Sequence, residues 1–132
     1  MNLRQEVEKR LLAFADSQTP KIPVAIEAVP FTKPDKGKYL ELVFIEPVVM
    51  NPTVDVERVR MLGIIQVACY APDGKGMRAI DELTQAVAAL FPVTDKQAFE
   101  TFTVEQTPKI SSSFPDDKFR CAVVRVKYRQ EI

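Results

Sequence analysis

Residues 63–91 read GIIQVACYAPDGKGMRAIDELTQAVAALF, and they carry the clearest structural pattern in the chain. The first part of this stretch alternates like a β-strand, the Pro-Asp-Gly-x-Gly segment makes a tight corner, and the remainder carries apolar residues at helical spacing. The stretch contains no residue equipped for catalysis. Its content is architectural, which favours a protein that builds an assembly over one that carries out a reaction.

The sequence predicts two amphipathic helices, one within this stretch and one at the N-terminus. The second helix, about residues 76–91, has an apolar stripe repeating every three or four residues and ends at Pro92. The first covers residues 2–17, where Asn2 and Gln5 form a plausible capping box. The stripes contain, in the first helix, Leu3, Val7, Leu11 and Phe14, and in the second, Met77, Ile80, Leu83, Val87 and Leu90.

Five other segments have the composition or alternation of β-strands. They are residues 24–29, 39–45, about 58–71, 100–106 and 119–130. The third is about twice the usual strand length, so part of the hairpin 39–71 should project from the core. Residues 47–57 are predicted as a loop and residues 107–118 as a mobile loop.

The order α-β-β-β-α-β-β predicts an α+β domain that spans residues 1–132. We expect a single mostly antiparallel or mixed sheet of about five strands, with both helices packed on one face. No internal repeat or domain linker interrupts this order.

Composition excludes several classes of function. Apolar residues make up 46% and charged residues 27%, which is typical of a globular domain. Eighteen basic residues balance eighteen acidic ones, which argues against binding to nucleic-acid backbones. We therefore expect no sequence-specific nucleic-acid binding. The sequence shows no membrane span, and its N-terminus is too polar for a secretory signal, so we expect a cytoplasmic protein.

The residue inventory predicts no catalytic, metal or cofactor site. The chain has no histidine, which removes Ser-His and Cys-His nucleophile pairs and imidazole metal ligands. Cys69 and Cys121 are expected as small buried side chains, with a disulfide left open if their strands are neighbours. The segment 73–76 lacks the spacing of a phosphate loop and is expected to be a corner, with Asp73 as a candidate helix cap.

A row of basic residues on the last strand is the clearest candidate for binding. Arg125, Lys127 and Arg129 alternate with apolar residues, so they share one face. Such a row faces solvent, cross-strand carboxylates such as Glu41 or Glu105, or an acidic partner, and the solvated face and the interface both remain open. The candidate interface residues are Arg58, Arg60, Arg125, Lys127, Arg129, Lys109 and Phe114.

Several motifs, mostly structural, run through nearly the whole chain. They are the N-terminal amphipathic helix, Ile22-Pro23-Val24-Ala25 leading to Val29-Pro30-Phe31, Tyr39-Leu40, Gly63-Ile64-Ile65-Gln66-Val67, Tyr70-Ala71-Pro72 with Gly74-x-Gly76, and Ala89-Leu90-Phe91-Pro92. In this combination the chain resembles the phage tail-terminator (tail-completion) proteins, related in fold to the tail terminator of lambda-like phages. Residues 107–118 match nothing in that family.

The resemblance implies a structural protein of a phage or prophage and no enzymatic activity. Such a protein would cap the tail tube as a homo-hexameric ring, be a monomer when free, and stop tube polymerisation. It would bind the tail tube protein and the head–tail connector, and would pass from the host cytoplasm into the virion tail. The alternative is a small α+β module of host origin that binds a ligand or protein between helix and sheet. Convergent polar residues inside the apolar faces would favour that alternative, and the sequence shows none.

Overall fold

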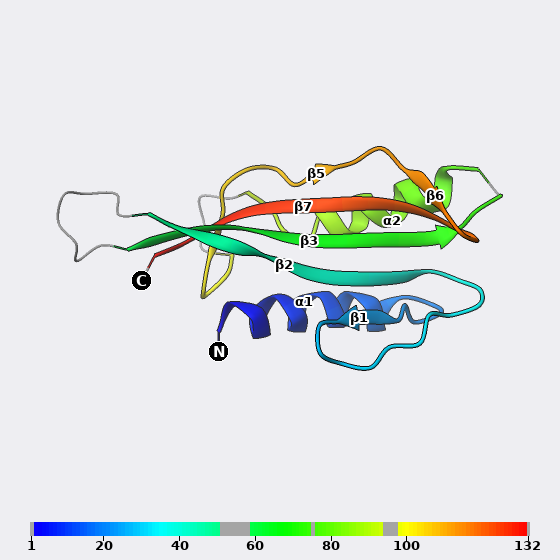
Figure 1. The fold of residues 1–132 in the computed structure, drawn as a ribbon, viewed down its shortest axis with the longest axis horizontal. Coiled ribbons are helices and arrows are strands. Elements are labelled where there is room, and N and C mark those ends of the chain that lie inside the picture. Colours follow the sequence, from blue (N-terminus) through cyan, green and yellow to red (C-terminus); the bar gives the residue numbers. More distant parts are fainter. Residues whose placement is uncertain (1, 51–58, 75, 94–97, 132) are drawn as a thin grey trace.

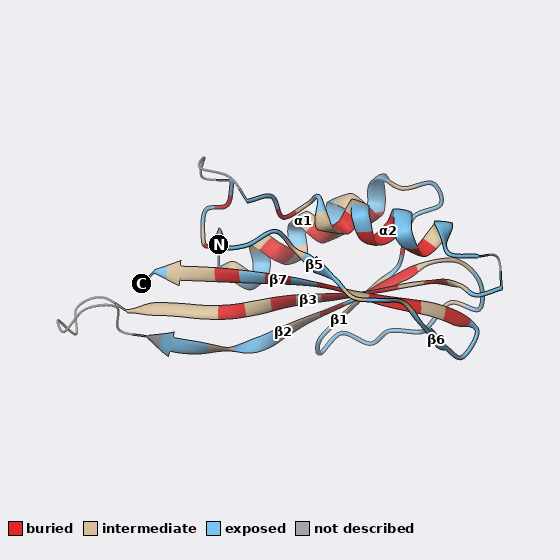
Figure 2. Ribbon diagram, turned by 90° about the horizontal axis from the view of Figure 1, so that it is seen from above, coloured by how far each residue is buried: buried red, intermediate tan, exposed pale blue. Residues whose placement is uncertain are grey.

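The computed structural model describes residues 2–50, 59–74, 76–93 and 98–131. Two helices cover the same face of one mixed β-sheet, which confirms the predicted α+β class and layer order (Figure 2). The elements are α1 (Leu3–Ser17), β1 (Val24–Ile26), β2 (Tyr39–Met50), β3 (Arg60–Pro72), α2 (Arg78–Ala88), β4 (Thr103–Val104), β5 (Lys109–Ile110), β6 (Phe114–Asp116) and β7 (Phe119–Glu131).

The sheet has seven strands in the order β1-β2-β3-β7-β4, with β5 and β6 also paired to β7 (Figure 1). β1 is parallel to β2, and the remaining pairs are antiparallel. The sheet therefore has more strands than the five expected. The additional strands arise because the segment 103–116 runs back along the outer edge of β7 and pairs with it in three short pieces.

The prediction of a loop over residues 107–118 is wrong where β5 and β6 form. The backbone N–H of Ser111 donates to the carbonyl of Val123 at 2.9 Å, and the Val123 N–H donates to the Ser111 hydroxyl at 2.9 Å. The long strand β7 presents a row of backbone donors and acceptors that need partners. Pro108, which lies in the gap between β4 and β5, lacks an N–H and cannot donate to this edge.

Other strand boundaries also differ from expectation. β2 continues to Met50, beyond the predicted end at residue 45, because the pairing with β3 shifts between Ile45 and Val48. This β-bulge accommodates Pro47 within the strand. The predicted strands 24–29 and 100–106 are shorter, since only β1 and β4 pair there. The remainder of the predicted loop, residues 51–57, lies outside the described residues.

The hairpin formed by β2 and β3 projects as predicted. Both views show these two strands continuing past the N-terminal end of α1 (Figures 1 and 2). The projecting part lies beyond the helices, so it has the helix-facing core on neither of its faces.

The core lies between the helices and the sheet. One stripe from each helix meets alternate residues of β2, β3 and β7, as the helical spacing predicts. All of the following are at most 3% exposed: Val7, Leu11 and Ala15 from α1, Ile80, Leu83 and Val87 from α2, and Leu40, Leu42, Ile65, Val67, Val124 and Val126 from the sheet. A chain of aromatic rings, Phe91, Phe99, Phe102 and Tyr128, connects the end of the α2 region to β7.

The corner between β3 and α2 departs from the predicted cap. Gly74 and Gly76 adopt φ values of 94° and 85°, which favour glycine. The N-cap of α2 is Met77, and its side chain makes no capping hydrogen bond. The candidate cap Asp73 instead donates its backbone N–H to the carbonyl of Lys118 at 2.9 Å, so it ties the corner to the turn between β6 and β7 rather than to the helix.

Polar side chains at the N-terminal end of α1 make two sets of hydrogen bonds. One set caps the helix, and the other binds the segment that leads into β4. The predicted capping box is present, with Asn2 and Gln5 exchanging hydrogen bonds of 3.0 and 2.8 Å. One turn further, the Glu6 carboxylate accepts hydrogen bonds from the backbone N–H groups of Glu100 (2.8 Å) and Thr101 (2.9 Å). The Thr101 hydroxyl donates a further bond to it. Glu6 therefore connects α1 to the residues that directly precede β4.

These hydrogen bonds predict an acid-sensitive contribution of Glu6 to stability. Partial burial by itself raises the pKa of the Glu6 carboxyl, but the bonds from Thr101 and the Glu100 backbone outweigh it and lower the pKa below its usual value. A lowered folded-state pKa means that the stabilisation is present above the unfolded pKa, about 4.3, and is lost as the pH falls through the folded value. We expect Glu6→Gln to lower Tm at neutral pH, and the deficit to shrink in thermal melts at about pH 3.

The matched control is Glu8→Gln, a substitution on the same helix at a side chain for which no hydrogen bond is found among the described residues. It should leave Tm nearly unchanged at both pH values. Equal behaviour of the two variants would show that the Glu6 contacts do not stabilise the fold.

Candidate interaction surface

The face of the sheet turned away from both helices is here called the open face (Figure 2). Strand alternation and the observed register assign its residues. They are Tyr39, Glu41, Val43, Ile45 and Val48 from β2, Leu62, Ile64, Gln66, Ala68 and Tyr70 from β3, and Cys121, Val123, Arg125, Lys127 and Arg129 from β7.

One end of the open face is covered by the segment that connects β1 to β2. Tyr39 stacks on Tyr70 with ring centroids 4.2 Å apart, and the edge of Phe119 meets Tyr39 at 5.0 Å. Phe31 lies 5.8 Å from Tyr39, and the Lys33 ammonium lies 5.3 Å from the Phe119 ring. Burial raises the pKa of Tyr39 to about 12, so its hydroxyl stays protonated. This aromatic end is filled by the chain itself.

The other end, here called the bare half, consists of Val43, Ile45, Val48, Leu62 and Ile64. Ile45 is 38% exposed and Val48 is 63% exposed, although both are large apolar side chains. A hollow of about 310 Å³ lies here. It is lined by the four residues of the bare half other than Val43, by Gly63 and Tyr128, and by the charged residues Glu46, Glu105 and Lys127. Contiguous exposed apolar residues bordered by charges are typical of protein–protein contact sites.

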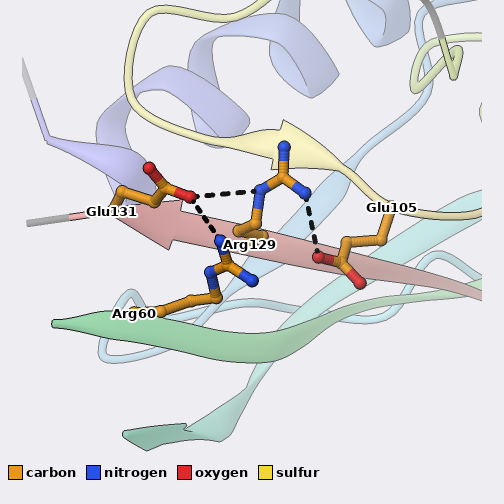
Figure 3. Close-up of polar contacts among 4 residues, drawn as sticks. All are labelled: Arg60, Glu105, Arg129 and Glu131. Atoms are coloured by element: carbon orange, nitrogen blue, oxygen red, sulfur yellow. Dashed lines mark hydrogen bonds and ion pairs between the residues drawn. The ribbon is translucent and has the colours of Figure 1, made fainter. Parts of the chain in front are cut away.

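The predicted basic row lies beside the bare half. Its members differ in whether a carboxylate neutralises them. Arg129 and Arg60 belong to an ion-pair chain with Glu131 and Glu105 (Figure 3). The Arg60 Nη2–Glu131 Oε1 distance is 2.9 Å, and the Arg129 Nη1–Glu105 Oε1 distance is 3.4 Å. Glu105 was one of the two carboxylates expected opposite the row. Partly exposed ion pairs of this kind contribute about 0–1 kcal/mol each to the free energy of unfolding. Their main effect is therefore to neutralise the charges of the two arginines.

Arg125 and Lys127 have no such neutralisation. Arg125 donates from Nε to the Gln66 side-chain oxygen at 3.1 Å, and Lys109 lies opposite Arg125 in the pairing of β5 with β7. Within the described part of the chain, Lys109, Arg125 and Lys127 are in no ion pair. They also line a second hollow of about 250 Å³. These three residues are here called the basic edge.

The structure thus brings together most, but not all, of the predicted interface residues. Arg60 and Arg129 share the ion-pair chain, and the basic edge lies next to it. Phe114 is 46% exposed but pairs opposite Cys121, near the aromatic end, so it is away from this cluster. Arg58 lies outside the described residues.

The interface residues predicted from the sequence include none of the apolar residues of the bare half. Val48 lies within the predicted loop, and the bulge that keeps it in β2 depends on the pairing with β3. The exposed apolar pair Val48 and Val49 directly after Pro47 was the available signal, since such residues rarely occupy a solvated turn.

The two cysteines lie on neighbouring strands but on opposite faces. Cys69 is opposite Ala122, while Cys121 is opposite Tyr70, so alternation directs Cys69 to the core and Cys121 to the open face. Both thiols are free and buried. Burial raises the pKa of Cys69 to about 12, which disfavours the reactive thiolate. The predicted buried cysteines are confirmed, and the disulfide left open by the sequence does not form.

Over the described ranges, no group of three or more His, Cys, Asp or Glu residues is arranged to hold a metal ion. In the same ranges, neither helix is both long and apolar enough to cross a membrane. The one buried polar side chain found there is Thr84, which donates to the carbonyl of Ile80 in its own helix at 3.0 Å.

A family model described as phage tail terminator protein matches residues 2–128. The chain belongs to the phage tail terminator family. This confirms the predicted resemblance and assigns the protein a structural role in a phage tail. The match includes residues 107–118, for which the sequence motifs had offered no counterpart.

Solved structures share the fold of this tail terminator. One chain without a descriptive name is 26% identical, with a TM-score of 0.76 over 97% of this chain and 92% of that chain. A chain from the virion of a native gene transfer agent particle is 16% identical, with a TM-score of 0.62 over 99% of this chain and 96% of that chain. No curated protein matches the sequence.

Proposed function

We propose that this tail terminator, acting as one domain, closes the end of the tail tube as a ring of six identical subunits. The ring stops further addition of the tail tube protein and presents its other side to the head–tail connector. Assembly takes place in the bacterial cytoplasm, and the ring remains in the virion tail. The observation that carries this proposal is the bare half beside the basic edge, an uncovered surface in a chain of this family.

The proposed mechanism is contact chemistry without turnover, cofactor or metal. A ring of identical subunits needs a heterologous contact, in which two different patches of the same chain meet. Burial of the exposed apolar residues would supply roughly 25 cal/mol per Å² of apolar surface. The charged residues beside them would fix orientation and make association weaken with salt.

Charge reversal of the basic edge tests this function. We expect Arg125→Glu with Lys127→Glu to impair tail completion. The natural cations would bind an acidic partner surface, and that surface would repel the two new carboxylates. Tm should change little, since both side chains are exposed and neither is in an ion pair within the described residues. Complementation of a phage that lacks its own tail terminator, scored as infectious particles and as tail length in electron micrographs, measures the effect.

Lys9→Glu with Lys21→Glu is the matched control, because both lysines are exposed and belong to neither the bare half nor the basic edge; Lys9 lies on α1 and Lys21 between α1 and β1. The control variant should complete tails normally. Normal tail completion by the Arg125/Lys127 variant would exclude the basic edge from the functional surface.

The alternative function, a ligand- or protein-binding module of host origin, needs polar groups converging inside an apolar pocket. Thr84, the buried polar residue of the described chain, has its hydroxyl bonded to the carbonyls of Ile80 and Asp81 within α2. Negative-stain images of the protein mixed with tail tubes separate the two readings. Rings at tube ends would support the tail terminator function, whereas bare tube ends would favour the alternative.

A further inference from the structure

The two hollows beside the bare half and the basic edge adjoin each other, and they differ in chemistry. Ile64 and Lys127 line both of them. The first hollow contains the exposed apolar side chains of Ile45 and Val48, and the second contains all three residues of the basic edge. In an extended segment, successive side chains point to opposite sides. A segment that alternates apolar and acidic residues could therefore lie along the boundary and fill both hollows at once.

The charges around the first hollow orient such a segment. Glu46 lines this hollow from β2, and within the residues that the structure places it is in no ion pair. Glu105 lines it from the other side but is already engaged by Arg129. Carboxylates of the segment would be repelled on the β2 side and attracted on the β7 side, where the basic edge lies.

The chain contains a segment with this alternation. Residues 54–57 read Val-Asp-Val-Glu. They belong to the segment 51–58, here called the connecting segment, which lies outside the described residues. It follows β2 and precedes β3, whose last described pair is Met50 with Arg60, at the projecting end of the hairpin (Figure 1). The sequence thus supplies two apolar and two acidic side chains in the order that the adjoining hollows require.

The connecting segment of the same chain is too short to bring both carboxylates to the basic edge. Lys127 lies opposite Ile64, which is five residues from Val59 along the chain, or about 16 Å at the rise per residue of a strand. Arg125 lies two residues further, at about 23 Å. Glu57 is two residues from Val59, so even a fully extended chain carries it no more than about 7 Å. The other carboxylate, two residues further from Val59, reaches no more than about 14 Å.

We propose that the connecting segment of one copy docks on the open face of the next copy, with its two valines in the apolar hollow and its two carboxylates on the basic edge. The inference rests on the proposed function. The contact joins two different patches of the same chain, so its repetition builds a ring. It also identifies the acidic surface that Arg125 and Lys127 bind as part of the neighbouring subunit.

Charge exchange between copies tests this contact. The segment variant carries Asp55→Lys with Glu57→Lys, and the edge variant carries Arg125→Glu with Lys127→Glu. Each is mixed with isolated tail tubes, alone or together with the other, and rings at tube ends are counted in negative-stain images. We expect either variant alone to lose most rings, because every contact then joins like charges. In the mixture, a ring of six that alternates the two variants joins opposite charges at every contact, so the ring count should return to that of the unmodified chain.

Asp16→Lys with Asp35→Lys is the matched control for the segment variant, because both carboxylates are exposed and line neither hollow. It should form rings by itself. A Tm close to that of the unmodified chain checks that each variant is folded.

Normal rings from either the segment variant or the edge variant alone would overturn the proposal. A mixture that stays without rings would also overturn it. If a single chain with all four substitutions then forms rings, the contact lies within one chain. These results leave the tail terminator function standing, whereas tube ends without rings for the unmodified chain would contradict both.

Discussion

Leu83→Asp is expected to unfold the protein. Leu83 is 3% exposed on the sheet-facing side of α2, in the same cluster as Val87 and Val124. The substitution removes apolar packing and buries a carboxylate with no cation beside it in that cluster. We expect a loss of at least about 4 kcal/mol, against a total stability of roughly 5–15 kcal/mol for an ordinary domain. Loss of the cooperative transition in thermal or urea unfolding measures the effect.

Gln85→Asp on the exposed side of α2 is the matched control. It introduces the same charge and the same helix propensity of Asp, but in solvent, so Tm should fall by only a few degrees. An unchanged Tm in Leu83→Asp would mean that this side of α2 is not the core side. That result would contradict both the helical spacing and the observed packing.

The helices and the three long strands were predictable because each is specified by its own local pattern. In α2, an apolar residue every three or four positions specifies a helix with one buried face, and Ile80, Leu83 and Val87 are buried together. Similarly, the alternation in 119–130 assigns Val124 and Val126 to the core face. The capping box at Asn2 is equally local, and it is present.

The short edge strands were not predictable for the opposite reason. β5 and β6 have two and three residues, and their pattern carries no period of its own. They are strands because β7 offers an edge at that position, and Ser111 completes the ladder with its side chain. The same dependence on a neighbour explains why β2 continues past Pro47, since β3 pairs with Val48 after the bulge.

The candidate surface was predictable only along a single strand. Alternation placed Arg125, Lys127 and Arg129 in one row, and the structure keeps them on one face. Which of these cations is neutralised depends on the register between strands, which no single segment encodes. The register gives Arg129 two carboxylates and leaves Arg125 with an amide, so the unneutralised charge lies further from the strand end than the row alone indicates.

Gly63→Ala is expected to destabilise the protein, although Ala is normally favoured over Gly in a strand interior. Gly63 pairs opposite Tyr128, and a Cβ at residue 63 would clash with the Tyr128 ring. Tyr128 is 4% exposed and packs against Phe102, so the ring has little freedom to move aside. Overpacking of this kind costs about 1–3 kcal/mol. The change in the free energy of unfolding, measured in urea, reports the loss.

A double-mutant cycle with Tyr128→Ala separates this clash from any general effect of the substitution. Without the ring, the three closest contacts of the new methyl group are removed, and Ala should then be favoured over Gly by about 0.5–1 kcal/mol in a strand interior. Gly63→Ala should therefore change sign, destabilising the natural chain and stabilising the Tyr128→Ala variant. An equal loss in both backgrounds would contradict the close approach. Because Gly63 and Tyr128 both border the hollow of the bare half, a displaced ring would also reshape the surface that we propose is covered in the ring.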